Sequence, residues 1–66
     1  MMPKIEWYSV EGDDVRLLSL DQANKLSKEK NIIKFDGYRK ENKWTVLGPS
    51  GRVGDFGSWL EAVEYL

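Results

Sequence analysis

Apolar and polar residues alternate over the first part of the chain, as they do in a strand with two different faces. Over residues 4–10 every second side chain falls on the same side, with Trp7 on one side and Tyr8 on the other. The run Glu11–Asp14 that follows contains glycine and aspartates, which favour turns. We therefore predict a hairpin in which residues 15–18 return beside the first strand.

The next pattern is that of a helix. Ser19 and Gln22 have the spacing of a capping box, in which the serine hydroxyl and the glutamine side chain satisfy exposed backbone donors. Small and apolar residues then recur at helical spacing. We predict a helix over residues 20–30 and expect Asn31 to end it in the left-handed conformation.

The second half of the chain contains three more strand patterns, over residues 32–38, 43–47 and 52–56. Ser58 then begins a second capping box and a helix of about two turns. The order is strand, strand, helix, three strands, helix. This predicts the α+β class, with a small antiparallel sheet and two short helices packed on one face. The 66 residues are expected to form a single small domain, 1–66.

Glycine stands at every third position from the end of the strand 43–47 to the start of the final helix: Gly48, Gly51, Gly54 and Gly57. The run lacks the Gly-Lys-Ser/Thr ending of a phosphate-binding loop. Pro49 presets the backbone for the second position of a turn. We therefore interpret these glycines as turn and close-packing residues.

The composition narrows the chemistry. The chain has no cysteine and no histidine, so it lacks disulfides, zinc-binding thiolates and the usual general base. The remaining polar residues form no catalytic constellation, and we expect neither an enzyme nor a cofactor or metal. There is no apolar segment of membrane-spanning length and no secretory signal. These observations predict a cytoplasmic protein with no membrane partner.

Aromatic residues are more numerous than one sheet face and two short helices need. This favours a small non-enzymatic protein-binding module, such as an accessory, regulatory or inhibitory protein, or one that self-associates. The expected surface combines the open sheet face with the glycine-rich turn, because aromatic rings supply contact area and charges set orientation. Its residues are Tyr38, Lys40, Lys43, Trp44, Arg52 and Phe56.

Nucleic-acid binding is the alternative. The hairpin 32–47 is basic, and cationic side chains beside aromatic rings can contact phosphates and stack on bases. The net charge of −1 for the whole chain counts against a dedicated nucleic-acid binder. On this alternative the phosphate contacts come from Lys34, Arg39, Lys40 and Lys43, and the stacking ring is Tyr38 or Trp44.

Overall fold

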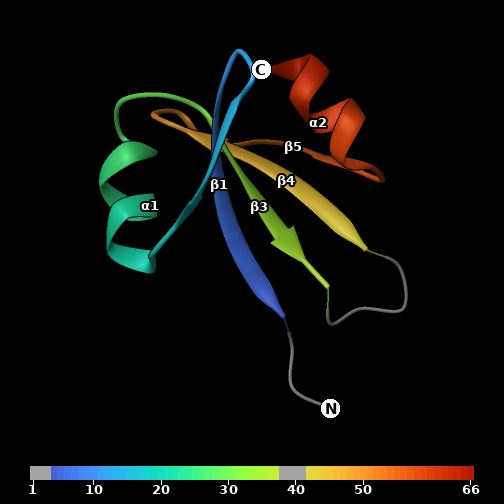
Figure 1. The fold of residues 1–66 in the computed structure, drawn as a ribbon, viewed down its shortest axis with the longest axis horizontal. Helices are drawn as coiled ribbons and strands as arrows, with labels where there is room; N and C mark the ends of the chain where they lie inside the picture. The colour runs from blue at the N-terminus through green and yellow to red at the C-terminus, as the bar shows by residue number, and fades with distance from the viewer. Residues whose placement is uncertain (1–3, 38–41) are drawn as a thin grey trace.

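Five antiparallel strands and two helices make up the fold in the computed structural model, which describes residues 4–37 and 42–66 (Figure 1). The elements are β1 (Ile5–Glu11), β2 (Asp14–Leu18), α1 (Leu20–Leu26), β3 (Ile32–Asp36), β4 (Lys43–Gly48), β5 (Gly51–Phe56) and α2 (Trp59–Tyr65). The strands lie in the order β2-β1-β3-β4-β5. The predicted α+β class, with an antiparallel sheet and two short helices, is confirmed.

The two shortest connections are tight turns whose shape depends on glycine. Gly12 has φ 60° and its neighbour Asp13 has no positive φ, which is the pattern of a type II′ hairpin turn between β1 and β2. Between β4 and β5, Pro49 precedes Gly51, whose φ is 93°. A proline at the second position and a left-handed glycine at the fourth are typical of a type I turn with a bulge. Both turns were predicted from their residues.

The first helix begins as predicted and ends earlier. The Ser19 hydroxyl accepts a hydrogen bond from the Gln22 N–H at 3.2 Å, and the Gln22 side chain accepts one from the Ser19 N–H at 2.9 Å. α1 ends at Leu26, with Ser27 as its C-cap. The predicted extension to residue 30 is wrong, because the chain leaves the helix in turns. Asn31 has no positive φ, so its predicted left-handed conformation is also wrong.

The main hydrophobic cluster lies between α2 and one face of the sheet, and Ala23 of α1 and Ile32 of β3 are buried as well. Ala62 is fully buried against Ile33 of β3 and Val46 of β4. The Trp59 ring packs beside this contact, with its centroid 5.4 Å from those of both Tyr8 and Trp44, each in an edge-on arrangement. Because alanine is small, α2 approaches the sheet closely, and the larger rings close the space on either side.

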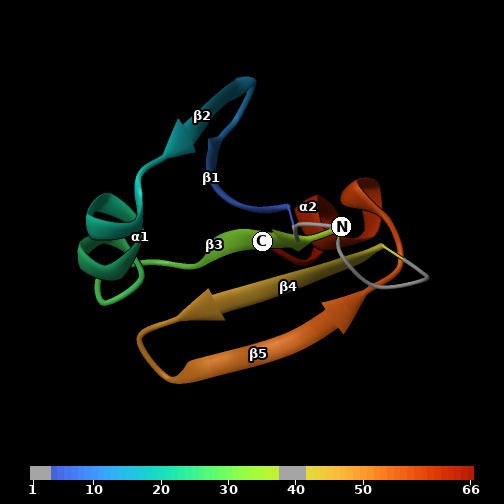
Figure 2. The same cartoon turned by 90° about the horizontal axis from the view of Figure 1, so that it is seen from below.

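α1 covers a different part of the molecule. It contacts β1 and β2, on the side that carries Ser9 and Leu18, whereas α2 covers the side that carries Tyr8. Side chains alternate across a strand, so each helix covers its own face and end of the sheet. In this detail the helices are distributed differently from the prediction, which placed both on one face. The twist of the sheet turns the β1–β2 hairpin steeply away from β4 and β5 (Figure 2).

The glycines after β4 provide a stability test. We expect Gly51→Ala to lower the free energy of unfolding by about 1–2 kcal/mol, because a positive φ brings Cβ against the backbone. Gly57→Ala is the matched control: nothing lies within 4 Å of the added Cβ, and φ is not positive. Its effect should stay within about 0.5 kcal/mol. Urea unfolding followed by tryptophan fluorescence measures both, and equal losses would contradict a conformational role for Gly51.

Candidate functional site

Trp44 and Phe56 of the predicted binding surface lie beneath α2. The Trp44 ring centroid is 4.3 Å from that of Phe35 and 5.4 Å from that of Trp59. The Phe56 ring centroid lies 5.3 Å from that of Tyr65 in α2. Both residues are half-buried against the hydrophobic core. A partner could reach these rings fully only by displacing α2.

Lys43 and Arg52, two charged residues of that surface, lie on the opposite side of the sheet. Lys43 and Arg52 both form ion pairs with the Asp55 carboxylate, at 3.3 and 3.5 Å. The Thr45 hydroxyl donates a hydrogen bond to the same carboxylate at 2.8 Å. This bond is the main reason why the pKa of Asp55 is lowered, and the two cations add to the effect.

The six predicted contact residues are therefore not brought onto one surface. Trp44 and Phe56 belong to the α2 side, and Lys43 and Arg52 belong to the other. Tyr38 and Lys40 lie outside the described residues.

The basic residues of the nucleic-acid alternative are also only partly placed. Lys34 lies directly opposite Thr45 in the sheet, so it shares a face with Lys43. Arg39 lies outside the described residues, as do Tyr38 and Lys40. The ring proposed to stack on a base, Trp44, packs on the other face. Lys34 and Lys43 are thus separated from it by the sheet itself.

The most accessible apolar residues of the sheet lie elsewhere, on the edge strand β2. Val15 is 49% exposed and Leu17 is 62% exposed. They stand opposite Val10 and Tyr8 of β1, so they lie on the same face of the sheet as α2. α2 does not reach this end of the face. The sequence pattern predicted this strand but indicated no role for it.

The backbone of β2 also has an unpaired side. Gly37 donates its N–H to the Lys4 carbonyl at 2.9 Å, which shows that the even-numbered residues of β1 bond to β3. The odd-numbered residues of β1 therefore face β2, and Ser9 stands opposite Arg16. It follows that the N–H and C=O groups of Val15 and Leu17 point outward. Within residues 4–37 and 42–66, no strand pairs with that side of β2.

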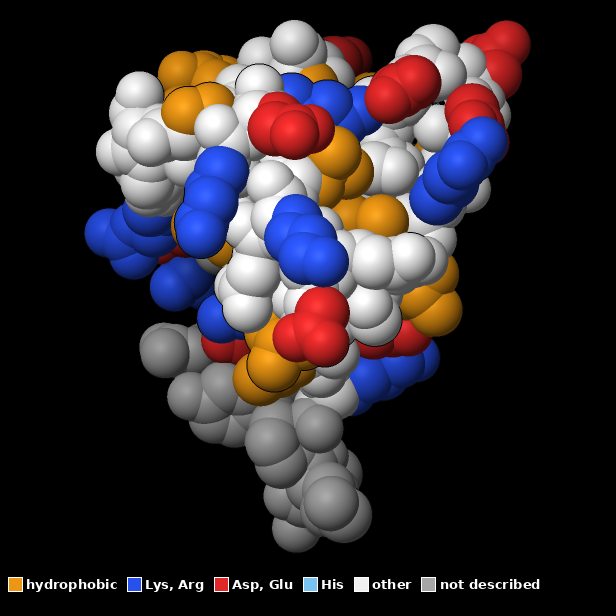
Figure 3. Space-filling view, turned by 90° about the vertical axis from the view of Figure 1, so that its left-hand side faces the viewer, with side chains coloured by type: hydrophobic (Ala, Val, Ile, Leu, Met, Phe, Trp, Pro, Cys, Tyr) orange, Lys and Arg blue, Asp and Glu red, His pale blue; other side chains and the backbone are white. Residues whose placement is uncertain are grey.

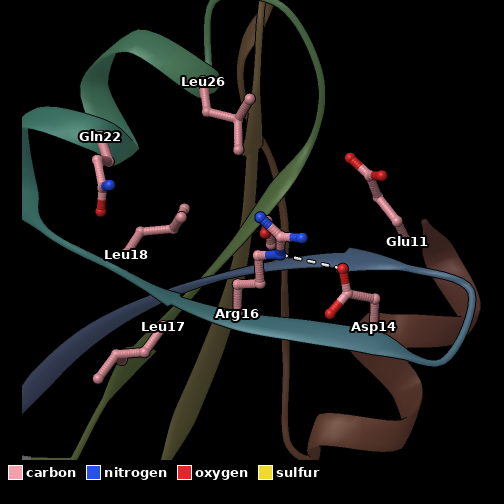
Figure 4. Close-up of a pocket in the computed structure, with 8 residues that line it drawn as sticks. Glu11, Asp14, Arg16, Leu17, Leu18, Gln22 and Leu26 are labelled. Atoms are coloured by element: carbon pink, nitrogen blue, oxygen red, sulfur yellow. Dashed lines mark hydrogen bonds and ion pairs between the residues drawn. The ribbon is translucent and has the colours of Figure 1, made fainter.

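A groove runs beside this edge, between β2 and α1, and we call it the α1–β2 groove. It consists of two adjoining hollows of about 300 and 260 Å³. Both are lined by Leu18, Gln22 and Leu26; the first is also lined by Ser9, Glu11, Asp14, Arg16 and Leu17, and the second by Lys25 and Glu29. Figure 4 shows the Leu18 and Leu26 side chains directed into the first hollow, whereas Leu17 points away from it.

The charges around the first hollow are paired. The Arg16 Nε lies 3.0 Å from an Asp14 carboxylate oxygen, and the Lys30 ammonium lies 2.5 Å from Glu11. The hydrogen bond from Lys30 is the main cause of the lowered pKa of Glu11. Figure 3, which faces the α1 end of the molecule, shows charged side chains of both signs interspersed with small apolar areas. The first hollow is therefore mainly polar, with Leu18 and Leu26 directed into it, and the second is mainly apolar. Neither has a strong field of one sign.

Comparison with known proteins adds no assignment: no family model, curated protein or solved structure matches the chain. Neither helix of the described segments is long and apolar enough to cross a membrane. Among the same residues, no group of carboxylates is arranged to hold a metal ion. The site must therefore be interpreted from its own geometry.

The Asp55 cluster provides a test of its electrostatics. We expect Thr45→Val to raise the pKa of Asp55 toward 3.8, because it removes the hydrogen bond that contributes most. A carboxyl group whose pKa is lower in the folded state than in the unfolded state stabilises the fold at pH values above its unfolded pKa. This stabilisation is lost as the pH falls through the folded pKa. The variant should therefore lose less stability than wild type as the pH falls below the ordinary value of 3.8.

Carboxyl-carbon NMR titration measures the Asp55 pKa directly, and Thr45→Ser is the control because it keeps the hydroxyl. An unchanged pKa in Thr45→Val, or an equal rise in Thr45→Ser, would assign the shift to the neighbouring cations instead.

Proposed function

We propose that this chain is a small protein-binding module that acts through the edge of β2 and the α1–β2 groove. Its ligand is an extended segment of a partner protein, which adds to the sheet as a further strand beside β2. The single observation that carries the proposal is that the outward backbone groups of Val15 and Leu17 border a groove into which the Leu18 and Leu26 side chains point.

The backbone of β2 favours an extended peptide as the ligand. The outward N–H and C=O groups of Val15 and Leu17 repeat every second residue along the edge. A second extended chain offers complementary groups at the same repeat, whereas a small molecule or a helix does not. Strand addition satisfies these groups in a row, and this provides affinity that depends little on the sequence of the partner.

The two sides of the edge provide the specificity. Side chains of an added strand alternate, so one set would pack beside Val15 and Leu17 and the other would enter the groove over Leu18 and Leu26. The apolar parts of these two surfaces are Val15 and Leu17 on one side and the second hollow of the groove on the other. The neighbouring Arg16 and Asp14 are paired with each other, so they present no net charge. The preferred segment therefore has apolar residues on both of its faces and little net charge.

A random-peptide library displayed on phage and selected on the immobilised protein tests this proposal. Enriched peptides should have runs of β-branched or aromatic residues and little net charge. In a fluorescence polarisation assay, Leu17→Lys should weaken their binding roughly tenfold or more, because an ammonium replaces an apolar contact at the edge. Leu60→Lys on α2 is the matched control: Leu60 is 63% exposed, nearly the same as Leu17 at 62%.

Binding that survives Leu17→Lys, or that both substitutions weaken equally, would contradict the site. Amide chemical shifts add a second readout, because a bound peptide should perturb β2 and α1 and leave β5 unchanged. Failure to enrich any peptide that binds the wild-type protein would count against the function itself.

A further inference from the structure

We propose that a second copy of this chain occupies the β2 edge when no partner segment is bound. The two β2 strands pair antiparallel about a two-fold axis that passes beside Val15, and they join two five-stranded sheets into one. This inference rests on the proposed function, because a partner segment and a second copy need the same backbone groups. Self-pairing therefore regulates access to the site.

Charge complementarity selects the arrangement. When Val15 faces Val15 of the second copy, Asp14 of each chain lies directly opposite Arg16 of the other. Val15 has outward backbone groups, so it forms the hydrogen-bonded pair, and the charged residues form the neighbouring pairs in which side chains come closest. Opposite charges that face each other across two strands stabilise the pair. The two-fold axis produces this contact twice.

The neighbouring registers lack this advantage. Pairing about Arg16 places the two guanidinium groups directly opposite each other, which is destabilising. Pairing about Leu17 places Arg16 opposite Leu18 and leaves both charges without an opposite partner in the second copy. The order Asp14, Val15, Arg16 on the edge thus fits itself in one register only.

Dimer formation costs little in broken interactions. Arg16 and Asp14 are already paired within the chain at 3.0 Å, and both are largely exposed, with side-chain exposures of 73% and 55%. They can exchange partners across the axis without leaving a charge unpaired. Val15, which is 49% exposed, becomes covered by its own copy. The gain is the backbone hydrogen bonding of an edge that otherwise faces water.

Single-cysteine variants test the register, because the natural chain contains no cysteine. In the proposed dimer the two Cα atoms of residue 15 lie about 5.5 Å apart, which suits a disulfide. Those of residue 17 lie roughly 14 Å apart, which does not. Val15→Cys should therefore form disulfide-linked dimers in a glutathione buffer, and Leu17→Cys should not. Val53→Cys, on the opposite edge strand β5, is the control for random collision.

Charge reversal tests the same contact without a covalent bond. Sedimentation equilibrium should show that Asp14→Arg and Arg16→Asp each raise the dimer dissociation constant roughly tenfold or more, because both place like charges opposite each other twice. An equimolar mixture of the two variants should form a heterodimer, since every pair is then opposite in charge. The double variant D14R/R16D should recover the wild-type dissociation constant.

Three results would overturn the inference: a wild-type chain that stays monomeric up to millimolar concentration, equal cross-linking of Val15→Cys and Val53→Cys, or a double variant that fails to recover dimerisation. These outcomes differ from failure of the proposed function. A monomeric chain whose selected peptides still lose affinity on Leu17→Lys retains the binding site and lacks only the self-pairing. Peptides that bind independently of Leu17 reject the proposed function instead.

Discussion

The contact of Ala62 with Ile33 and Val46 determines how the rest of the molecule is arranged. All three residues are completely buried, and the small alanine lets α2 lie close to the sheet. The Trp59 ring then fits edge-on between Tyr8 and Trp44. In a domain of this size the available apolar surface barely offsets the loss of chain entropy, so the large rings are needed in this one layer. These aromatic residues therefore stabilise the fold and are not available to contact a partner.

The length of α2 sets the limit of what this layer can cover. A helix of seven residues extends about 10 Å, the width of roughly two strand spacings. α2 contacts β4 and β5 through its length, and Trp59 reaches as far as Tyr8 in β1. Beyond that point Val15 and Leu17 continue the same face without a covering helix. α1 does not cover them because it packs on the other side of the hairpin. The uncovered edge is therefore a consequence of short helices on a wide sheet.

Local signals made the elements predictable, whereas the pairing of surfaces depended on distant contacts. Ser19 and Gln22 cap α1 as their spacing predicted, and the residues of both tight turns identified them. Alternation along a strand shows which of its own side chains share a face. It carries no information on whether a helix covers that face, because the cover comes from residues that are remote from β4 in the chain.

The same distinction explains the misassigned features. Asn31 was expected to end a helix through its own backbone, yet its side chain lies against Gly48, where an added Cβ would come within 1.9 Å of the Asn31 Oδ1. Gly48 is therefore a close-packing glycine, as predicted. The residue that packs against it, Asn31, could not be inferred from the sequence around Gly48. Likewise, β2 has the apolar and charged alternation of an ordinary strand, and only the strand order reveals that it lies at an edge.

Edge strands commonly carry charges that oppose association, and β2 shows why charge alone does not protect an edge. A single cation facing outward would repel its own copy and hold water at the edge. Here Arg16 is accompanied by Asp14, two residues away on the same side, so the two charges cancel and do not repel an uncharged strand. The pair is also complementary to the same pair in an antiparallel second copy. The other side of the strand carries only Val15 and Leu17. Charges of one sign along this edge would repel a second copy, whereas in the proposed dimer the Asp14 and Arg16 pair selects the register.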